Sequence, residues 1–90
     1  MTTAIDVRIA GMVQGVGFRY WTMEKARELG LAGWVRNEDN GDVTAHLEGD
    51  DDVLSEMVRA LWQGPRWSNV TDVKTSQSTV KGLTSFKLEY

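Results

Sequence analysis

The sequence predicts a two-layer α+β sandwich in which two helices cover one face of a mostly antiparallel sheet. Strand-like stretches that alternate apolar and polar residues are interleaved with two stretches in which apolar residues recur every three or four positions, as they do in helices. The expected order is β-α-β-β-α-β with a possible short fifth strand. At 90 residues and 41% hydrophobic content, the chain is expected to form one domain over residues 1–90.

The first strand is expected at residues 4–10, where apolar side chains alternate with Asp6 and Arg8. A helix is expected to begin at Phe18, because an apolar stripe follows it with helical spacing. The stripe consists of Phe18, Thr22, Ala26 and Leu29. Gly30 suits the C-terminal cap of this helix.

Two apolar runs, at residues 31–36 and 43–48, are expected to pair as antiparallel strands. Between them, Asn40 and Gly41 form a dipeptide that favours positive φ in a tight hairpin turn. A crossover through the first helix makes the strands at 4–10 and 31–36 run in the same direction. Their ends, near Gly11 and Asn37, should therefore lie at the same edge of the sheet.

The second helix is expected after Asp50, Asp51 and Asp52, whose carboxylates suit a helix N-terminus. Its apolar stripe consists of Leu54, Met57, Val58 and Leu61. The Gly-Pro pair at 64–65 ends it. Residues 70–75 and 85–90 are expected to be further strands, joined by a polar connection at 76–84.

Composition excludes several classes of function. The chain has no cysteine and one histidine, which rules out a thiolate nucleophile, a thiolate metal site and a site made of several histidines. The net charge of −3 argues against a nonspecific grip on nucleic acid. No stretch is long and apolar enough to span a membrane, and the N-terminus lacks the pattern of a secretion signal, so a cytoplasmic protein is expected.

The segment GMVQGVGFRY, residues 11–20, joins the first strand to the first helix. Gly11, Gly15 and Gly17 allow positive φ there, and consecutive N–H groups that point one way form an anion-binding concavity. The helix N-terminus adds further donors. Arg19 lies at the positive end of the helix, where its charge is unfavourable, and a bound anion would offset this unfavourable interaction. Its guanidinium matches the oxygens of phosphate or carboxylate. From spacing alone, anion binding and a plain turn with a solvated arginine both remain open.

The segment IAGMVQGVGFR, residues 9–19, resembles the acylphosphatase signature Gly-x-Val-Gln-Gly-Val-x-Phe-Arg. GWVRNEDNGDV, residues 33–43, is similar to the second signature of that family, Gly-Trp-Val-x-Asn followed by a Gly-x-Val hairpin. The resemblance spans nearly the whole chain. It implies a ferredoxin-like βαββαβ fold, hydrolysis of acyl phosphates to carboxylate and phosphate, and no cofactor or metal.

The resemblance also implies the site residues. Arg19 would bind the phosphate and Asn37 would hold the attacking water. The backbone amides of Gln14, Gly15, Val16, Gly17 and Phe18 would form the phosphate cradle. The substrate would be a small acyl phosphate, inorganic phosphate would be both product and competitive inhibitor, and the chain is expected to be a monomer without a nucleic-acid or membrane partner.

Chemistry makes so simple a site plausible. An acyl phosphate releases a carboxylate whose conjugate acid has a pKa of about 4, so no general acid is needed at neutral pH. The amide of Asn37 can orient a water but is not a strong base, and the substrate phosphate can take the proton. Other functions remain open for comparison: an RNA-binding module, because the same architecture serves RNA recognition, and a phosphate-binding relic without turnover.

Several other residues have simpler roles than catalysis. The side chain of Gln14 is expected to orient the turn, and His46 is expected to be a surface or packing residue of its strand. The carboxylates at 50–52 are explained by the helix N-terminus rather than by a metal. The tryptophans at positions 21, 34 and 62 are expected in the core or half-buried.

Overall fold

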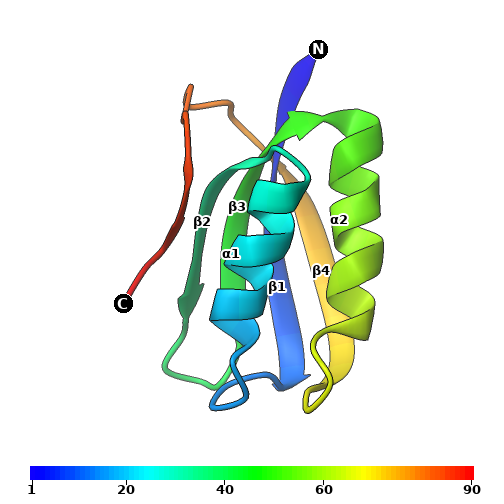
Figure 1. Cartoon of the computed structure of the whole chain (residues 1–90), viewed down its shortest axis with the longest axis vertical. Helices are drawn as coiled ribbons and strands as arrows, with labels where there is room; N and C mark the ends of the chain where they lie inside the picture. The colour runs from blue at the N-terminus through cyan, green and yellow to red at the C-terminus, as the bar shows by residue number, and fades with distance from the viewer.

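The computed structural model describes residues 1–90 and consists of one five-stranded sheet covered on one face by two helices (Figure 1). The elements are, in chain order, β1 (Thr2–Met12), α1 (Phe18–Glu28), β2 (Ala32–Asn37), β3 (Val43–Asp50), α2 (Asp51–Gln63), β4 (Asn69–Ser78) and β5 (Phe86–Leu88). The strand order across the sheet is β4-β1-β3-β2-β5. Only the β2–β5 pair is parallel, so the predicted α+β sandwich with a mostly antiparallel sheet is confirmed.

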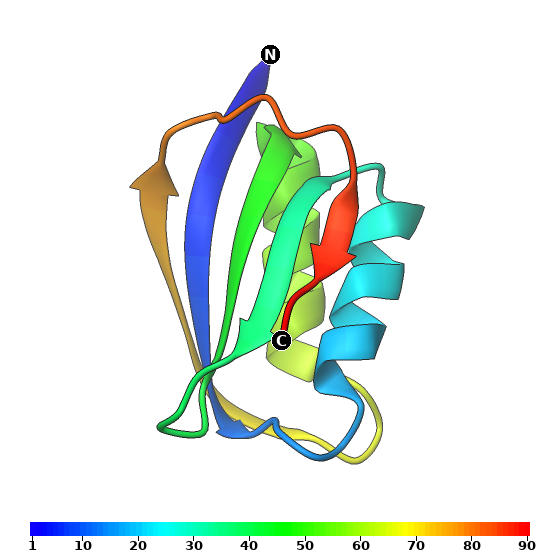
Figure 2. The same cartoon turned by 90° about the vertical axis from the view of Figure 1, so that its left-hand side faces the viewer.

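The core lies between the sheet and the helices. Apolar side chains on one face of the strands meet the apolar stripes of both helices, as the alternating patterns predict. The largest fully buried apolar members include Phe18, Phe86, Ile9, Leu47, Met57 and Leu61. The opposite face of the sheet has no helix over it (Figure 2). No helix is both long and apolar enough to cross a membrane.

Helix α1 begins and ends where the sequence predicts. Gly17 precedes it with a φ of 77°, a left-handed conformation that glycine adopts without strain. At the other end Gly30, with a φ of 73°, donates to the carbonyl of Arg27, while Leu31 donates to that of Ala26. This pair of bonds is the Schellman cap, which turns the chain into β2.

Several details differ from the sequence predictions. Strand β4 extends to Ser78, so the polar connection is shorter than expected, and β5 covers only Phe86–Leu88. In the hairpin only Gly41 has positive φ, because the N–H of Gly41 closes a turn onto the carbonyl of Glu38 and a single left-handed residue completes the reversal. Trp62 is 47% exposed, because the buried stripe of α2 lies on another side of the helix.

Strands β1 and β2 both run antiparallel to β3 and therefore point the same way. The β1–α1 turn and the β2–β3 hairpin consequently leave the sheet at the same edge, as predicted, and both lie at the bottom of Figure 2. The turn after α2 also lies at this end. This edge brings the glycine-rich segment and Asn37 together.

Candidate active site

The glycine-rich turn presents a series of unpartnered N–H groups. Gly15 and Gly17 have φ values of 75° and 77°. The backbone N–H groups of residues 14–17 make no hydrogen bond to any group of the chain. The first bond of α1 runs from the N–H of Trp21 to the carbonyl of Gly17, which leaves the N–H groups of the first helical turn free as well. Consecutive free donors at a helix N-terminus form a site for an anion.

Arg19 lies in the first turn of α1, next to these donors. Its Nη1 donates a hydrogen bond of 2.7 Å to the backbone carbonyl of Glu89, just beyond β5. Its guanidinium carbon lies 5.0 Å from the centroid of the Tyr90 ring. No carboxylate lies within 4.0 Å of Arg19. The end of the chain therefore orients the guanidinium without neutralising it.

Asn37, the last residue of β2, lines the same hollow as Arg19. This hollow has a volume of about 180 Å³, and we name it the catalytic hollow after the role that we propose for it below. It is lined by Val13, Gly15, Gly17, Phe18, Arg19, Tyr20, Asn37 and Leu88. The structure thus brings together a carboxamide, a guanidinium and the glycine turn, three groups that the two sequence motifs supply separately.

The side chain of Gln14 fastens the turn to the hairpin. Its Nε2 donates to the backbone carbonyls of Glu38 and Asp42, at 2.8 Å and 2.9 Å. The structural role predicted for Gln14 is supported, but its partner is the hairpin and not the turn itself. Because Glu38 directly follows Asn37, these two bonds fix the position of Asn37 relative to the cradle.

The hairpin is stabilised by a second set of contacts on its outer side. The carboxylate of Glu38 accepts a hydrogen bond of 2.6 Å from Thr44 Oγ1 and one of 2.8 Å from Arg36 Nε. The bond from Thr44, followed by that from Arg36, holds the pKa of Glu38 below its usual range. The same carboxylate raises the pKa of Arg36. Both groups therefore stay charged at neutral pH and keep the base of the hairpin ordered.

His46 lies outside the catalytic hollow, on β3. It is 1% exposed, and its two ring nitrogens lie 2.8 Å from Asp6 Oδ1 and 2.6 Å from Glu48 Oε2. Glu48 also accepts hydrogen bonds from the N–H groups of Lys81 and Leu83. Burial raises the pKa of Glu48, but the bonds from His46, Lys81 and Leu83 outweigh burial and hold that pKa below its usual range. This cluster fastens the segment before β5 to the sheet, so the packing role predicted for His46 is supported.

Two contacts of the site were not found from the sequence. The anchoring of Arg19 to Glu89 depends on β5 pairing beside β2, and no local pattern indicates that pairing. The partner of Gln14 depends in the same way on how two distant loops meet.

No group of three or more histidine, aspartate or glutamate side chains is arranged to hold a metal ion. Trp67 and Ser68 lie in the turn after α2, where Ser68 Oγ donates to the carbonyl of Pro65 at 2.7 Å.

The fold and the catalytic hollow define a small α+β domain that offers an anion a glycine-rich turn, a helix N-terminus and a guanidinium at one sheet edge. The chain belongs to the acylphosphatase family, whose sequence pattern matches residues 5–88. It is an enzyme of that family, and the family implies hydrolysis of acyl phosphates.

Relatives from other organisms agree with this assignment. An acylphosphatase from a Nocardioides species is 48% identical over 86 residues, which cover 96% of this chain and 87% of the relative. One from Thermotoga maritima is 40% identical over 87 residues, covering 97% of both chains. The crystal structure of acylphosphatase from Bacillus subtilis has a TM-score of 0.95 at 37% identity, with 100% of both chains covered. The structure of an acylphosphatase from Coxiella burnetii also has a TM-score of 0.95, at 36% identity, and the match covers 98% of this chain and 93% of that one. The ferredoxin-like fold implied by the sequence motifs is confirmed.

Proposed function

We propose that this chain hydrolyses acyl phosphates by in-line attack of a water, positioned by Asn37, on a phosphoryl group held by Arg19 and the backbone amides of residues 14–18. The observation that carries the proposal is the meeting of free N–H groups, Arg19 and Asn37 at one hollow of about 180 Å³. Phosphoryl transfer needs mainly positioning and stabilisation of charge on the phosphoryl oxygens, and these groups can supply both.

The phosphoryl oxygens would lie in the cradle, where they accept hydrogen bonds from the N–H groups of Gln14 to Phe18. The positive end of α1 favours the negative charge of the phosphate. One donor of the Arg19 guanidinium is used by the carbonyl of Glu89, so the remaining N–H groups can bind two phosphoryl oxygens together. The charge that develops in the transition state is therefore met by donors that are already oriented.

The carboxamide of Asn37 would accept a hydrogen bond from the attacking water and hold it in line with the bond that breaks. An amide does not remove a proton at neutral pH, so the proton passes to a phosphoryl oxygen of the substrate. Water oxygen bonds to phosphorus as the bond from phosphorus to the acyl oxygen breaks, and the electron pair leaves with the carboxylate. Because the carboxylate is a weak base, it leaves without a general acid.

The groups that this mechanism uses lie within residues 14–37, so the site needs no residue of a second subunit, and we expect a monomer formed by one domain over residues 1–90. The proposed mechanism uses neither a cofactor nor a metal. Orthophosphate resembles the transferred group and remains in the cradle after the carboxylate has left. We therefore expect inorganic phosphate to act as a competitive product inhibitor.

The direct test is hydrolysis of acetyl phosphate in the presence of a chelator. Arg19→Ala is expected to lower kcat/KM by at least about 100-fold, the usual cost of removing an oriented donor of charge. Asn37→Ala is expected to lower kcat strongly while inhibition by inorganic phosphate stays nearly unchanged. Arg59→Ala, on the exposed side of α2, is the matched control and should behave as the wild type. Full turnover by Asn37→Ala, with Arg19→Ala inactive, would show that Asn37 does not hold the water.

A further inference from the structure

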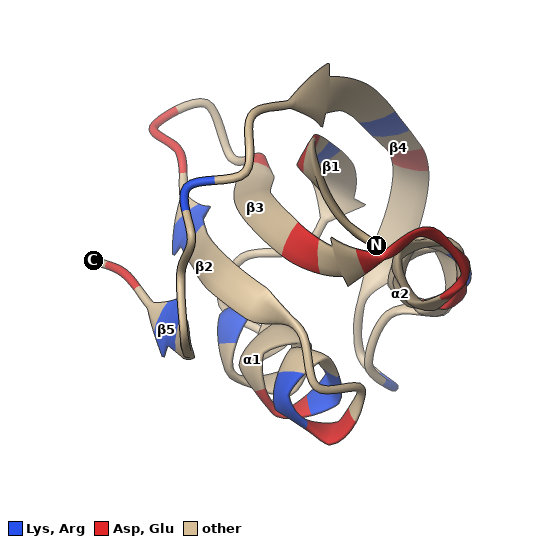
Figure 3. Ribbon diagram, turned by 90° about the horizontal axis from the view of Figure 1, so that it is seen from above, with Lys and Arg blue, Asp and Glu red and all other residues tan.

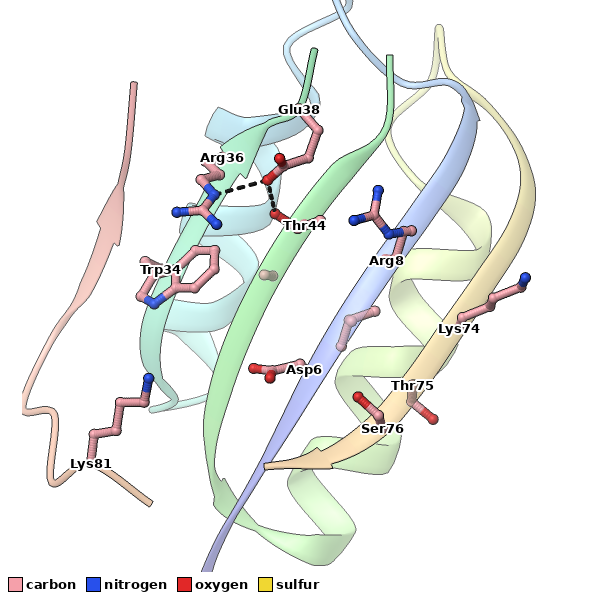
Figure 4. A pocket seen from close by; sticks show the side chains of 12 residues that line it. Asp6, Arg8, Trp34, Arg36, Glu38, Thr44, Lys74, Thr75, Ser76 and Lys81 are labelled. Atoms are coloured by element: carbon pink, nitrogen blue, oxygen red, sulfur yellow. Dashed lines mark hydrogen bonds and ion pairs between the residues drawn. The ribbon is translucent and has the colours of Figure 1, made fainter. Parts of the chain in front are cut away.

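A second hollow lies on the face of the sheet that no helix covers (Figure 4). It has a volume of about 620 Å³ and shares no lining residue with the catalytic hollow. We name it the open-face hollow. Its charged and polar walls include Arg8, Arg36, Lys74, Lys81, Thr44 and Trp34. These side chains come from β1, β2, β3 and β4 and from the segment before β5 (Figure 4).

The strand register arranges the polar side chains of this face in a row. Arg36 on β2 is opposite Thr44 on β3, and Thr44 is opposite Arg8 on β1. Arg8 is in turn opposite Lys74 on β4. Directly paired residues point to the same face of a sheet, and neighbouring strands lie about 4.8 Å apart. Three cations and a hydroxyl group therefore extend over roughly 14 Å across the sheet.

One cross-strand pair of this row is electrostatically unfavourable in the free protein. Like charges placed directly opposite one another destabilise a sheet, and Arg8 and Lys74 are such a pair. Arg8 is relieved by Asp42 at 2.9 Å and Arg36 by Glu38 at 2.8 Å. Neither Lys74 nor Lys81 has a carboxylate within 4.0 Å. A bound anion would offset the repulsion.

The charge of the side chains that line the open-face hollow is opposite to that of the rest of the chain. Four lysines and arginines line the open-face hollow, with two acidic residues, Asp6 and Glu38. The whole chain has 10 lysines and arginines and 13 aspartates and glutamates. Outside the hollow there are therefore 10 − 4 = 6 basic and 13 − 2 = 11 acidic residues. Both acidic residues of the hollow are already bound, Asp6 to His46 and Glu38 to Arg36. In Figure 3 basic bands cross β4, β2 and the segment before β5, and acidic bands lie on β4, on β3 and at the start of α2.

We propose that the open-face hollow binds an oligophosphate anion, a chain of linked phosphates laid across β2, β3, β1 and β4. A single tetrahedral anion can touch only one or two of these side chains, whereas a phosphate chain can contact Arg36, Thr44, Arg8 and Lys74 in turn. Arginine forks and lysine ammonium groups both bind phosphate oxygens, and Lys81 closes the side of the hollow near β5.

The surroundings of Trp34 favour phosphate over base recognition. The guanidinium carbon of Arg36 lies 4.5 Å from the centroid of the Trp34 ring and covers it. The ring of His46 is stacked against Trp34 as well, with centroids 6.2 Å apart. The indole is therefore not free to stack a nucleobase, as a sequence-tolerant binder of single strands would require. The site accordingly fits the phosphate chain itself, which is the shared part of inorganic polyphosphate and a nucleoside triphosphate.

The test is an NMR titration of ¹⁵N-labelled protein with inorganic tripolyphosphate at low salt. We expect saturable shifts of the amide signals of Arg8, Thr44 and Lys74, and an affinity that falls as salt is added. Orthophosphate should instead shift the signals of residues 14–18. A parallel titration with ATP distinguishes inorganic polyphosphate from a nucleoside triphosphate as the ligand. Equal affinity for ATP and tripolyphosphate indicates that the protein recognises only the phosphates, and clearly tighter binding of ATP indicates a nucleotide ligand.

The double variant Lys74→Gln/Lys81→Gln should bind tripolyphosphate about tenfold more weakly, since it removes two unpaired cations. It should keep the rate of acetyl phosphate hydrolysis. The matched control is Lys25→Gln/Arg59→Gln, which removes the same charge from the helix side of the sheet. Equal weakening in both double variants would overturn the proposal, because binding would then follow net charge alone.

Two other results would also overturn it. One is the absence of shifts on the open face at millimolar tripolyphosphate. The other is tighter binding of a single-stranded RNA than of tripolyphosphate at equal phosphate concentration, which would make the ligand a nucleic acid. Because the measurements are shifts and affinities on the open face, they are independent of whether Arg19 and Asn37 perform catalysis.

Discussion

Gln14→Ala removes the two hydrogen bonds that connect the glycine-rich turn to the hairpin, while it leaves the backbone amide of residue 14 in the cradle. The bonds measure 2.8 Å and 2.9 Å, both partly buried, and end on the carbonyls of Glu38 and Asp42. At about 1 kcal/mol for each bond, the free energy of unfolding should fall by about 1–3 kcal/mol. For a domain of this size that is a decrease in Tm of roughly 5–15 °C.

The effect on catalysis should be selective. Without Gln14, the hairpin can move relative to the cradle, and a displacement of about 1 Å at Asn37 is expected to lower kcat up to roughly 100-fold. The phosphate contacts should persist, because Arg19 is held by the carbonyl of Glu89 on another side of the hollow. We therefore expect a large change in kcat with less than about a threefold change in inhibition by inorganic phosphate.

A double-mutant cycle with Asn37→Ala gives the decisive measurement. If Gln14 acts by positioning Asn37, Gln14→Ala should cost almost no further kcat when Asn37 is already absent. The same fold-loss in both backgrounds, or an unchanged kcat in the single variant, would refute this reasoning. Gln77→Ala, an exposed change on β4, controls for loss of a glutamine as such.

Three further predictions concern the fold that supports the site. Gly33→Ala is expected to prevent stable folding, because an added Cβ would overlap a main-chain carbonyl of β3. The control Gly82→Ala, with φ 74° and open space around it, should lower the free energy of unfolding, measured in urea, by about 1 kcal/mol. Phe86→Ala should lose about 3–5 kcal/mol of unfolding free energy and also activity, because it loosens β5 and the anchor of Arg19; full turnover at low temperature would contradict the second part. The pKa of Glu48 is held below its usual range, so its stabilising effect is present above the unfolded value of about 4.3 and is lost as the pH falls through the folded value. Glu48→Gln should thus be destabilised at pH 7, and the difference from the wild type should shrink below pH 4 in denaturant titrations.

Local patterns were sufficient to predict most of the fold. Alternation located the strands, and the stripes of Phe18 and Leu54 located the helices, because burial on one side leaves a period in the sequence. The crossover rule then placed Asn37 beside the glycine turn. These predictions depend only on short segments and on the handedness of chain connections, which is why they could be made without coordinates.

The features that could not be predicted from the sequence depend on contacts between distant segments. A strand was expected at residues 85–90, but no local pattern indicates that it pairs in parallel with β2, as Phe86–Leu88 does. The anchoring of Arg19 therefore could not be predicted. The same holds for His46, whose carboxylate partners become neighbours only through the β1–β3 register and the path of the segment before β5. The residue types were visible in the sequence, but their partners were not.

The manner in which Arg19 is held bears on why it suits a phosphate. A carboxylate partner would orient the guanidinium but would also cancel its charge and compete with the substrate for its N–H groups. Here a neutral backbone carbonyl, that of Glu89, accepts only one of the five N–H donors. The full positive charge and most of the donors therefore stay unpaired at the catalytic hollow, which Arg19 lines together with Gly15 and Gly17 of the turn. In the mechanism that we propose, orientation by an uncharged group leaves this single arginine fully charged to stabilise the phosphoryl oxygens.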